Sequence, residues 1–258
     1  MGEELSQKSA LRSFYASESS DRTSDAWLSE GGSAAIPENA ASRYFLQRKV
    51  DSALAMAGAP APRHLLEVGS SWGHQTFLLA ERLARITAVD LSPESIALAQ
   101  RRAARWSVSN VSFQVGDAEE LSDHADAQYD AVFSFSTVRF CPHPERALAE
   151  MHRVLAPGGR VVVDFPNADC PWYGPLKRQL GIDRHIHDRL FRAGEAVRLV
   201  EEAGFEQVQV RFVLFTSKRV PSWSLPGFRL IDAVGERLPG VRNRAGIVMV
   251  SGRKRAER

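Results

Sequence analysis

Cysteine, long apolar runs and excess charge are all scarce in this chain of 258 residues. The two cysteines, Cys141 and Cys170, are far apart and form no C-x-x-C pair, which indicates neither a zinc site nor a disulfide framework and suits the reducing cytosol. No apolar stretch approaches the roughly 18 residues that span a bilayer, and the first residues lack the apolar core of a signal peptide. We therefore expect a cytoplasmic protein with no membrane span and no metal site.

The formal net charge is only +2, so the chain as a whole has no general attraction to nucleic acid. Residues 253–258 are locally basic, but a tail of this kind is usually just solvated. Nucleic acid is therefore not expected as a partner. The hydrophobic content of 44% is ordinary for a buried core, and one α/β domain with elaborated ends is the simplest interpretation.

Phosphate-binding loops are missing as well. No G-x-x-x-x-G-K-[ST] sequence occurs, and the loop after a predicted strand at 64–68 reads G-x-x-x-G, from Gly69 to Gly73, where a dinucleotide fold has G-x-G-x-x-G. Glu67 lies near the end of that strand, and a carboxylate in this place repels phosphates and attracts cations. The loop is therefore predicted to bind a positively charged ligand that has no phosphate.

Strand and helix patterns alternate along most of the chain. A second strand at 86–90 ends on Asp90, 21 positions after Gly69, which suits a ribose diol. Pro93 begins a helix to about residue 106, so strand, loop, helix and strand form a βαβ unit. Further strands are predicted at 111–115, 131–135, 161–165, 207–214 and 246–251, and further helices at 37–56, 144–155 and 195–203. Gly158 and Gly159 are expected to end the helix that begins at residue 144, before the fifth strand starts.

Five segments resemble, in order, motifs of the class I S-adenosyl-L-methionine (SAM) dependent methyltransferases, particularly the small-molecule enzymes of the type 11 group. The segments are 67–73, 89–93, 116–118, 129–132 and 153–159, and the likeness spans roughly residues 60 to 165. The resemblance implies an α/β fold with a Rossmann-like, seven-stranded, mostly parallel sheet flanked by helices, whose last pair of strands is antiparallel. It also implies SAM as the cofactor.

The resemblance further implies roles for individual residues. Glu67 would face the ammonium group of the methionine part of SAM. The backbone at Gly69 and Gly73 would lie against that part, and Asp90 would accept both ribose hydroxyls. Taken singly, each of these acids could instead be a strand-end acid that caps a helix.

Adenine would be held beyond the third strand. Asp117 would take the amino group, the Ala118 amide would bond a ring nitrogen, and Leu91 would lie against the ring face. Ser71, which is followed by Trp72, departs from the family pattern because it stands at the middle glycine, yet serine can hydrogen-bond the cofactor carboxylate. The predicted cofactor-binding residues are Glu67, Gly69, Ser71, Trp72, Gly73, Asp90, Leu91, Asp117, Ala118 and Ser134.

Two segments lie outside these motifs. Residues 1–36 are rich in serine and acids and poor in apolar anchors, which predicts either a flexible arm or, as in the family, a lid over the cofactor. Residues 37–258 would form the methyltransferase domain. Within it, an insertion at 166–192 follows the fifth strand, where open α/β sheets place their ligands, and is predicted to be the wall of the acceptor pocket. Its basic and aromatic residues suit an anionic or sugar-like acceptor, although a solvated surface loop has a similar composition.

Methyl transfer from a sulfonium is an in-line displacement, for which the protein aligns donor and acceptor and excludes water. A hydroxyl or an acidic carbon acceptor also needs a base, and His187 and His185 in the insertion are the candidates, although either could be structural. The family often has a histidine where this chain has Phe140. No catalytic role is therefore carried over from that position.

The predicted function is SAM-dependent methyl transfer to a small-molecule, sugar or lipid-linked acceptor, such as a glycan or lipid precursor. One alternative is a SAM-binding protein of the same fold that transfers no methyl group, either a cyclase or a regulatory subunit. Another is a nucleic-acid methyltransferase, although the motif of base-directed enzymes is missing at residues 134–140. An NAD-dependent reductase is disfavoured by the glycine loop. The sequence leaves the acceptor atom and the oligomeric state open.

Overall fold

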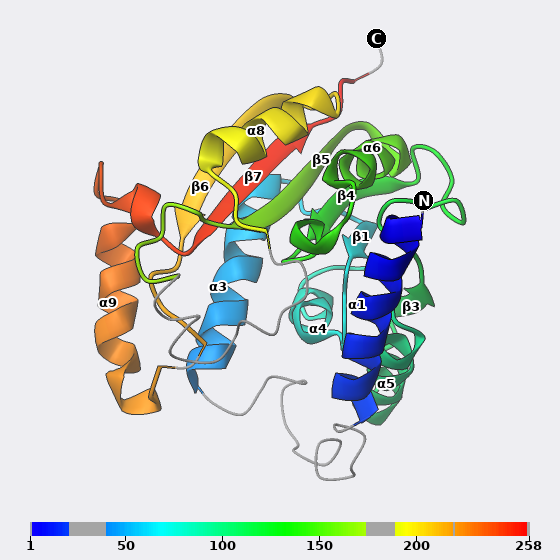
Figure 1. Ribbon diagram of the computed structural model, residues 1–258, viewed down its shortest axis with the longest axis horizontal. Coiled ribbons are helices and arrows are strands. Elements are labelled where there is room, and N and C mark those ends of the chain that lie inside the picture. Colours follow the sequence, from blue (N-terminus) through cyan, green and yellow to red (C-terminus); the bar gives the residue numbers. More distant parts are fainter. Residues whose placement is uncertain (1, 21–39, 174–188, 219, 257–258) are drawn as a thin grey trace.

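The structure, a computed structural model, describes residues 2–20, 40–173, 189–218 and 220–256. Seven strands in this part of the chain form one sheet in the order β3-β2-β1-β4-β5-β7-β6 (Figure 1). They are β1 (Leu65–Val68), β2 (Ile86–Asp90), β3 (Val111–Val115), β4 (Tyr129–Ser134), β5 (Leu155–Pro166), β6 (Glu206–Val213) and β7 (Ile247–Arg253). β7 runs antiparallel to both β5 and β6, and the other neighbours are parallel. The predicted Rossmann-like, mostly parallel sheet with an antiparallel end is confirmed.

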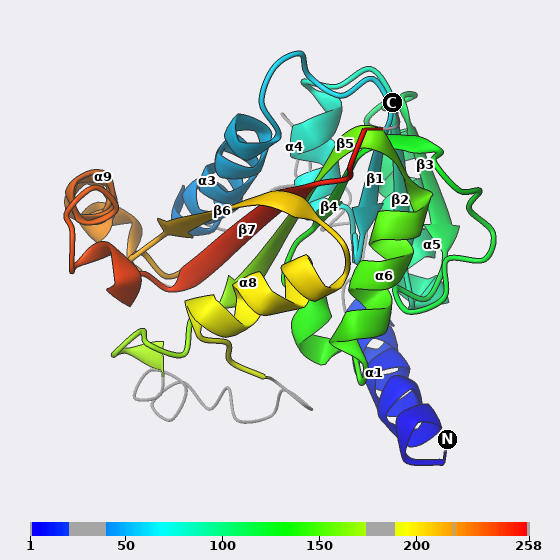
Figure 2. The same cartoon turned by 90° about the horizontal axis from the view of Figure 1, so that it is seen from above.

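Helices cover both faces of the sheet (Figure 2). One face carries α3 (Ala40–Ala57), α4 (His74–Ala80) and α5 (Pro93–Arg105), and the other carries α6 (Pro144–Val154) and α8 (Ala193–Glu202). Two more helices, α1 (Gly2–Ser20) and α9 (Leu225–Gly235), lie at the periphery. Among the helices that the structure describes, none has the length and apolar character that crossing a membrane requires.

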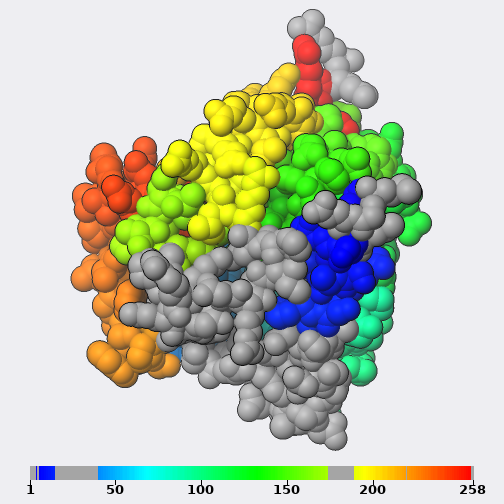
Figure 3. All heavy atoms as spheres, in the orientation of Figure 1, coloured from blue at the N-terminus to red at the C-terminus, as the bar shows by residue number. Residues whose placement is uncertain are grey.

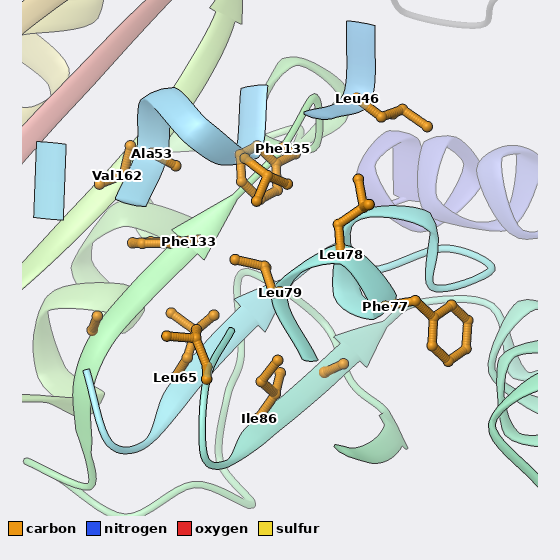
Figure 4. Close-up of a cluster of buried hydrophobic side chains, with 14 of the residues drawn as sticks. Leu46, Ala53, Leu65, Phe77, Leu78, Leu79, Ile86, Phe133, Phe135 and Val162 are labelled. Carbon is orange, nitrogen blue, oxygen red and sulfur yellow. The ribbon is translucent and has the colours of Figure 1, made fainter. Parts of the chain in front are cut away.

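The core consists of one apolar cluster on each side of the sheet. Figure 4 shows the cluster on the α3 side, which includes Leu46 and Ala53 of α3, Leu79 of α4, and Leu65 and Phe133 of the central strands. All residues of β1 are buried, because helices cover both of its faces. This explains why the central strands appear in the sequence as continuous apolar runs instead of alternating ones.

Strand register brings the carboxyl ends of four strands together at one edge of the sheet. Val68 of β1 pairs with Val89 of β2 and with Ser134 of β4, and Asp90 pairs with Val115 of β3. The loops that follow these strands therefore lie next to one another. In open α/β sheets, ligands bind at this edge, where the carboxyl ends of the strands lie.

Two elements differ from the sequence prediction. Gly158 and Gly159, which were predicted to end the preceding helix, lie inside β5. This strand begins directly after α6, because Leu155 already pairs with Tyr129 of β4. Helix α9 was not predicted at all. Residues 2–20 of the segment predicted as an arm or a lid form α1, which packs beside α5.

Candidate functional site

The loop after β1 needs glycine at two positions. Gly69 and Gly73 have φ angles of 82° and 83°, in the left-handed region that side-chain-bearing residues rarely adopt. A Cβ at Gly69 would lie 1.8 Å from Thr137 Oγ1, and one at Gly73 would lie 2.7 Å from the ring of Phe77. Ser71 also has a positive φ, 48°, so this serine adopts a conformation that glycine takes at no steric cost.

Asp90 ties the end of β2 to this loop. Its Oδ2 accepts a hydrogen bond from the Ser71 amide at 2.8 Å, and its Oδ1 accepts one from the Ser92 amide at 3.0 Å. Removal of water by the surrounding protein raises the pKa of Asp90, and these two hydrogen bonds oppose the rise. The N-cap of α5 is Ser92, whose Oγ accepts from the Ser95 amide at 3.1 Å. Capping of α5 thus does not account for the acid at position 90.

Glu67 is a buried carboxylate with a relative exposure of 1%. Neither of its oxygens makes a hydrogen bond of regular geometry within the described residues. Burial raises the pKa of Glu67 to about 8; the Thr76 hydroxyl opposes this rise and the charge of Asp90 adds to it. A buried acceptor without a donor is costly, so a cationic donor next to Glu67 would be strongly favoured.

Asp117 is held by the N-terminal helix. Nζ of Lys8 in α1 lies 2.8 Å from Asp117 Oδ2 and 2.7 Å from Glu119 Oε2. Desolvation disfavours the charged form of Lys8, but the hydrogen bonds to the two acids outweigh it and the pKa of Lys8 is raised. Asp117 Oδ1 also accepts the Glu119 amide at 2.9 Å. The acid that the resemblance assigns to adenine thus has a protein cation as its partner in this structure.

A cavity of about 330 Å³ lies between these loops and α1. Six of the predicted cofactor-binding residues line it, namely Gly69, Ser71, Asp90, Leu91, Asp117 and Ala118. The resemblance did not identify the other residues that line it, which include Lys8, Leu11 and Arg12 of α1, Leu46 of α3, and His74, Gln75, Phe135, Ser136, Thr137, Arg139, Phe140 and Lys218. Leu11 and Arg12 recur one helical turn after Lys8, and this spacing is the only sequence signal that could have indicated the contribution of α1.

Four predicted residues do not line the cavity. Glu67 lies just below it, since the next two residues of the chain are on its wall. Ser134 is fully buried, and its Oγ donates to the carbonyl of Val68 at 3.0 Å, which joins β4 to β1. Trp72 is 8% exposed, and its carbonyl accepts a hydrogen bond from Arg102 at 3.1 Å. Gly73 caps the N-terminus of α4.

The opposite side of the cavity is basic. Lys49 and Asp164 form a fully buried ion pair with a distance of 2.5 Å between Nζ and Oδ2, and Lys49 also donates to Ser136 Oγ at 2.9 Å. Lys218 reaches the cavity without an ion pair to any described residue, and its Nζ lies 5.3 Å from the centre of the Phe45 ring. Desolvation, and next the charge of Lys49, lower the pKa of Lys218 to about 8. No pattern in the sequence indicated this lysine.

The acidic and basic groups lie above different strands of the sheet. Asp90 ends β2 and Asp164 lies near the end of β5, three strands away, which corresponds to about 14 Å at the usual strand spacing. The cavity therefore has carboxylates at the end near β2 and the cationic groups of Lys218 and Arg139 at the end near β5.

The candidate bases His185 and His187 lie outside the described residues, as does most of the insertion. Its described ends, 166–173 and 189–192, do not line the cavity, although the Arg139 guanidinium donates to the Tyr173 hydroxyl at 3.3 Å. Within the residues that can be described, no group of three or more His, Cys, Asp and Glu side chains could hold a metal ion.

Known proteins share both the sequence motifs and the fold. Residues 66–163 match the family model described as methyltransferase domain. A SAM-dependent Diels-Alderase from Talaromyces variabilis is 29% identical over 182 residues, which cover 64% of this chain and 61% of that protein. The ubiquinone/menaquinone biosynthesis C-methyltransferase of Rubrivivax gelatinosus is 37% identical over 121 residues, which cover 47% of this chain and 46% of that protein.

Among solved structures, magnesium protoporphyrin IX methyltransferase from Synechocystis PCC 6803, with bound SAH, has a TM-score of 0.64. The match covers 96% of this chain and 99% of that chain at 15% identity, which is a likeness of fold. The chain spans less than two thirds of the length of the curated relatives named above. The ordered motifs, the sheet topology and the domain match at residues 66–163 make the chain similar to the class I SAM-dependent methyltransferases.

Proposed function

We propose that this protein transfers the methyl group of SAM to a small-molecule acceptor in the cytoplasm. The observation that supports the proposal most is the cavity at the carboxyl ends of the parallel strands, with the unsatisfied carboxylate of Glu67 beneath it. In this proposal residues 37–258 are the methyltransferase domain. The segment 1–36 acts as a lid through α1, three of whose side chains form part of the cavity wall.

The residues present fit the cofactor. A cationic amino acid group beside Glu67 would give the two buried oxygens the donors that they lack. Asp90 has both oxygens close to the cavity wall and would accept a ribose diol, with partial loss of its present amide contacts. Asp117 could receive the adenine amino group where Lys8 now lies, which would link binding to a shift of α1. When bound, SAM supplies a methyl group already activated on a sulfonium.

The acceptor end favours acidic molecules. Lys218 and Arg139 both line the cavity with cationic side chains. The buried Lys49 pairs with Asp164. A carboxylate, phenol or enol, whether on a free small molecule or on a sugar or lipid-linked precursor, would be held there with its ionised oxygen stabilised. His187 and His185 remain the proposed bases for acceptors that must lose a proton on reaction. The protein then has to align donor and acceptor and exclude water.

A pericyclic enzyme that binds SAM without methyl transfer is the second candidate. It is favoured by one specific observation, the similarity to a protein named SAM-dependent Diels-Alderase. The same cavity could hold SAM as a structural cation beside a substrate that cyclises.

Calorimetry and product analysis separate these possibilities. The full chain should bind SAH, the demethylated product of SAM, and incubation with SAM and a panel of phenols, carboxylic acids and sugar acids should release one SAH for each methylated product. Absence of any affinity for SAM and SAH would overturn both proposals. A cyclised product formed with SAM left intact would replace methyl transfer by the pericyclic alternative.

A further inference from the structure

Exposed apolar side chains are concentrated in one segment of the surface. Residues 222–245 contain η3 (Ser222–Ser224), α9 and η4 (Arg242–Arg244). Six of the nine large apolar side chains that are exposed in the described residues lie here: Trp223, Leu230, Ile231, Val234, Leu238 and Val241. Trp223 is 84% exposed and Leu230 65%. We call this set the α9 surface, and Figure 3 shows the segment in orange and red at one edge of the molecule.

The polarity of α9 is the reverse of that of an ordinary surface helix. Leu230, Ile231 and Val234 point to solvent, whereas Asp232 is fully buried against the domain. Asp232 accepts hydrogen bonds from the amides of Phe215 and Thr216 and from the hydroxyl of Thr216. An amphipathic helix normally buries its apolar stripe. This helix is attached by the polar contacts of Asp232 together with the buried side chain of Leu225, and it leaves Leu230, Ile231 and Val234 uncovered.

Further contacts fix this orientation. Glu236 accepts the amide of Leu214 at 3.0 Å and pairs with Arg48 of α3. At Gly235 the helix approaches the domain so closely that a Cβ would lie 2.7 Å from the ring of Phe215. Rotation of α9 to bury its apolar side chains would break all of these contacts. The uncovered stripe is therefore a built feature of the fold.

The charge around the α9 surface is basic. Arg229, Arg237, Arg242 and Arg244 are exposed, and none of them forms an ion pair with a residue that the structure describes. Arg229 lies over the ring of Tyr44. Because both acids of α9 and the turn after it are engaged on the inner side, the outward charge of this segment is entirely positive.

We propose that the α9 surface docks on an anionic lipid surface, with α9 lying in the plane of the interface. Exposed aliphatic side chains beside a tryptophan, bordered by arginines, are the combination that partitions into the headgroup region of anionic bilayers. A second copy of the chain fits less well, because a two-fold contact through this face would bring two sets of arginines together. The inference goes beyond methyl transfer and does not depend on it.

Vesicle flotation of the full chain tests the apolar part of the proposal. Binding is expected to vesicles of phosphatidylcholine and phosphatidylglycerol in equal parts, and only weakly to phosphatidylcholine alone. The triple variant Leu230→Gln, Ile231→Gln and Val234→Gln should bind at least about tenfold more weakly. The matched control Val115→Gln with Val210→Gln, which removes exposed apolar side chains from β3 and β6, should bind as the parent protein does.

A second variant tests the charges. Arg237→Gln, Arg242→Gln and Arg244→Gln together should remove the preference for phosphatidylglycerol, and raising the salt concentration should weaken binding of the parent. Arg198→Gln with Arg211→Gln, which removes two exposed arginines elsewhere, is the control. An unchanged melting temperature and SAH affinity would show that each variant is folded.

Three results would overturn the proposal. The first is a parent protein that floats with neither vesicle, and the second is an apolar triple variant that binds as well as the parent. The third is a parent that is dimeric by light scattering, with a monomeric triple variant and no vesicle binding, which would assign the face to self-association.

Discussion

Replacement of Glu67 by glutamine should stabilise the ligand-free protein at alkaline pH and weaken its cofactor binding. The carboxylate has a pKa of about 8 in the folded chain and an ordinary value of 4.5, so the folded state holds the proton more tightly than the unfolded state. Between these two pH values the unfolded state loses its proton first. The stability of the parent protein therefore falls as the pH rises from 4.5 to 8.

The size of the effect follows from the same numbers. Each pH unit between the two values is worth about 1.4 kcal/mol, so the Glu67 carboxylate costs the folded state up to about 5 kcal/mol above pH 8. Glu67→Gln keeps the shape and removes the titration. The difference in unfolding free energy, variant minus parent, should therefore grow by up to about 5 kcal/mol between pH 4.5 and 8.5.

Urea unfolding of both proteins across this pH range, without ligand, measures the difference directly. Glu202→Gln, which removes an exposed carboxylate from α8, is the charge control. In calorimetry at pH 7.5 the parent should release up to one proton when SAH binds, because an ammonium group beside Glu67 lowers its pKa again, and the variant should release none through this group. Parallel stability curves for Glu67→Gln and the parent would refute the reasoning, since the side chain would then be ionised at no cost.

Four further substitutions test other parts of the site. Asp90→Ala should weaken SAH binding about tenfold to a hundredfold, and unchanged affinity in calorimetry would contradict the ribose assignment. Lys8→Gln should make amide hydrogen exchange at residues 2–14 about fivefold faster, which corresponds to a loss of about 1 kcal/mol in the free energy of opening α1. An unchanged exchange rate would show that the contacts of Lys8 do not hold this helix. Lys49→Met should lower the unfolding free energy by about 3 to 5 kcal/mol, because Asp164 would be left buried and unpaired. Adding the second change Asp164→Asn should restore much of this loss. A loss below about 1 kcal/mol in the single variant Lys49→Met would mean that the pair is solvated. The pKa of Lys218 is lowered to about 8, so the folded state loses this proton before the unfolded state. Because the residue is exposed, solvent screens its charge, and the stability of the parent relative to Lys218→Gln should rise only slightly with pH between 8 and 10.5 in urea titrations; a fall over this range would contradict the lowered pKa.

Local patterns in the sequence were enough to predict the strand ends and several of the residues that line the cavity. Glu67 and Asp90 follow buried apolar runs, and in a parallel sheet such strand ends share one edge. Gly69 and Gly73 stand where the backbone takes a positive φ, which is a requirement of the loop itself. These features depend on neighbours within a few positions or on the regular repeat of the βαβ unit. They could therefore be predicted without coordinates.

Contacts between distant segments could not be predicted in this way. Lys8 meets Asp117, and Lys218 reaches the cavity next to Lys49 and Asp164, only because α1 and the segment after β6 pack where they do. The composition of residues 1–36 predicted an arm or a lid equally well, and no periodicity distinguishes a lysine that binds an acid from one that binds water.

The sequence by itself determined the order of the seven strands, the acids near the ends of β1 and β2, and the resemblance to the class I SAM-dependent methyltransferases. Tertiary structure alone decided which charges surround the cavity, that Ser134 and Trp72 support the loop without lining the cavity, and that α9 turns its apolar side chains outward. The physical reason is the distance along the chain between the residues that interact. Backbone conformation and amphipathic patterning depend on residues that are near in the chain, whereas a buried ion pair or an uncovered helix face depends on which distant residues share the same small volume.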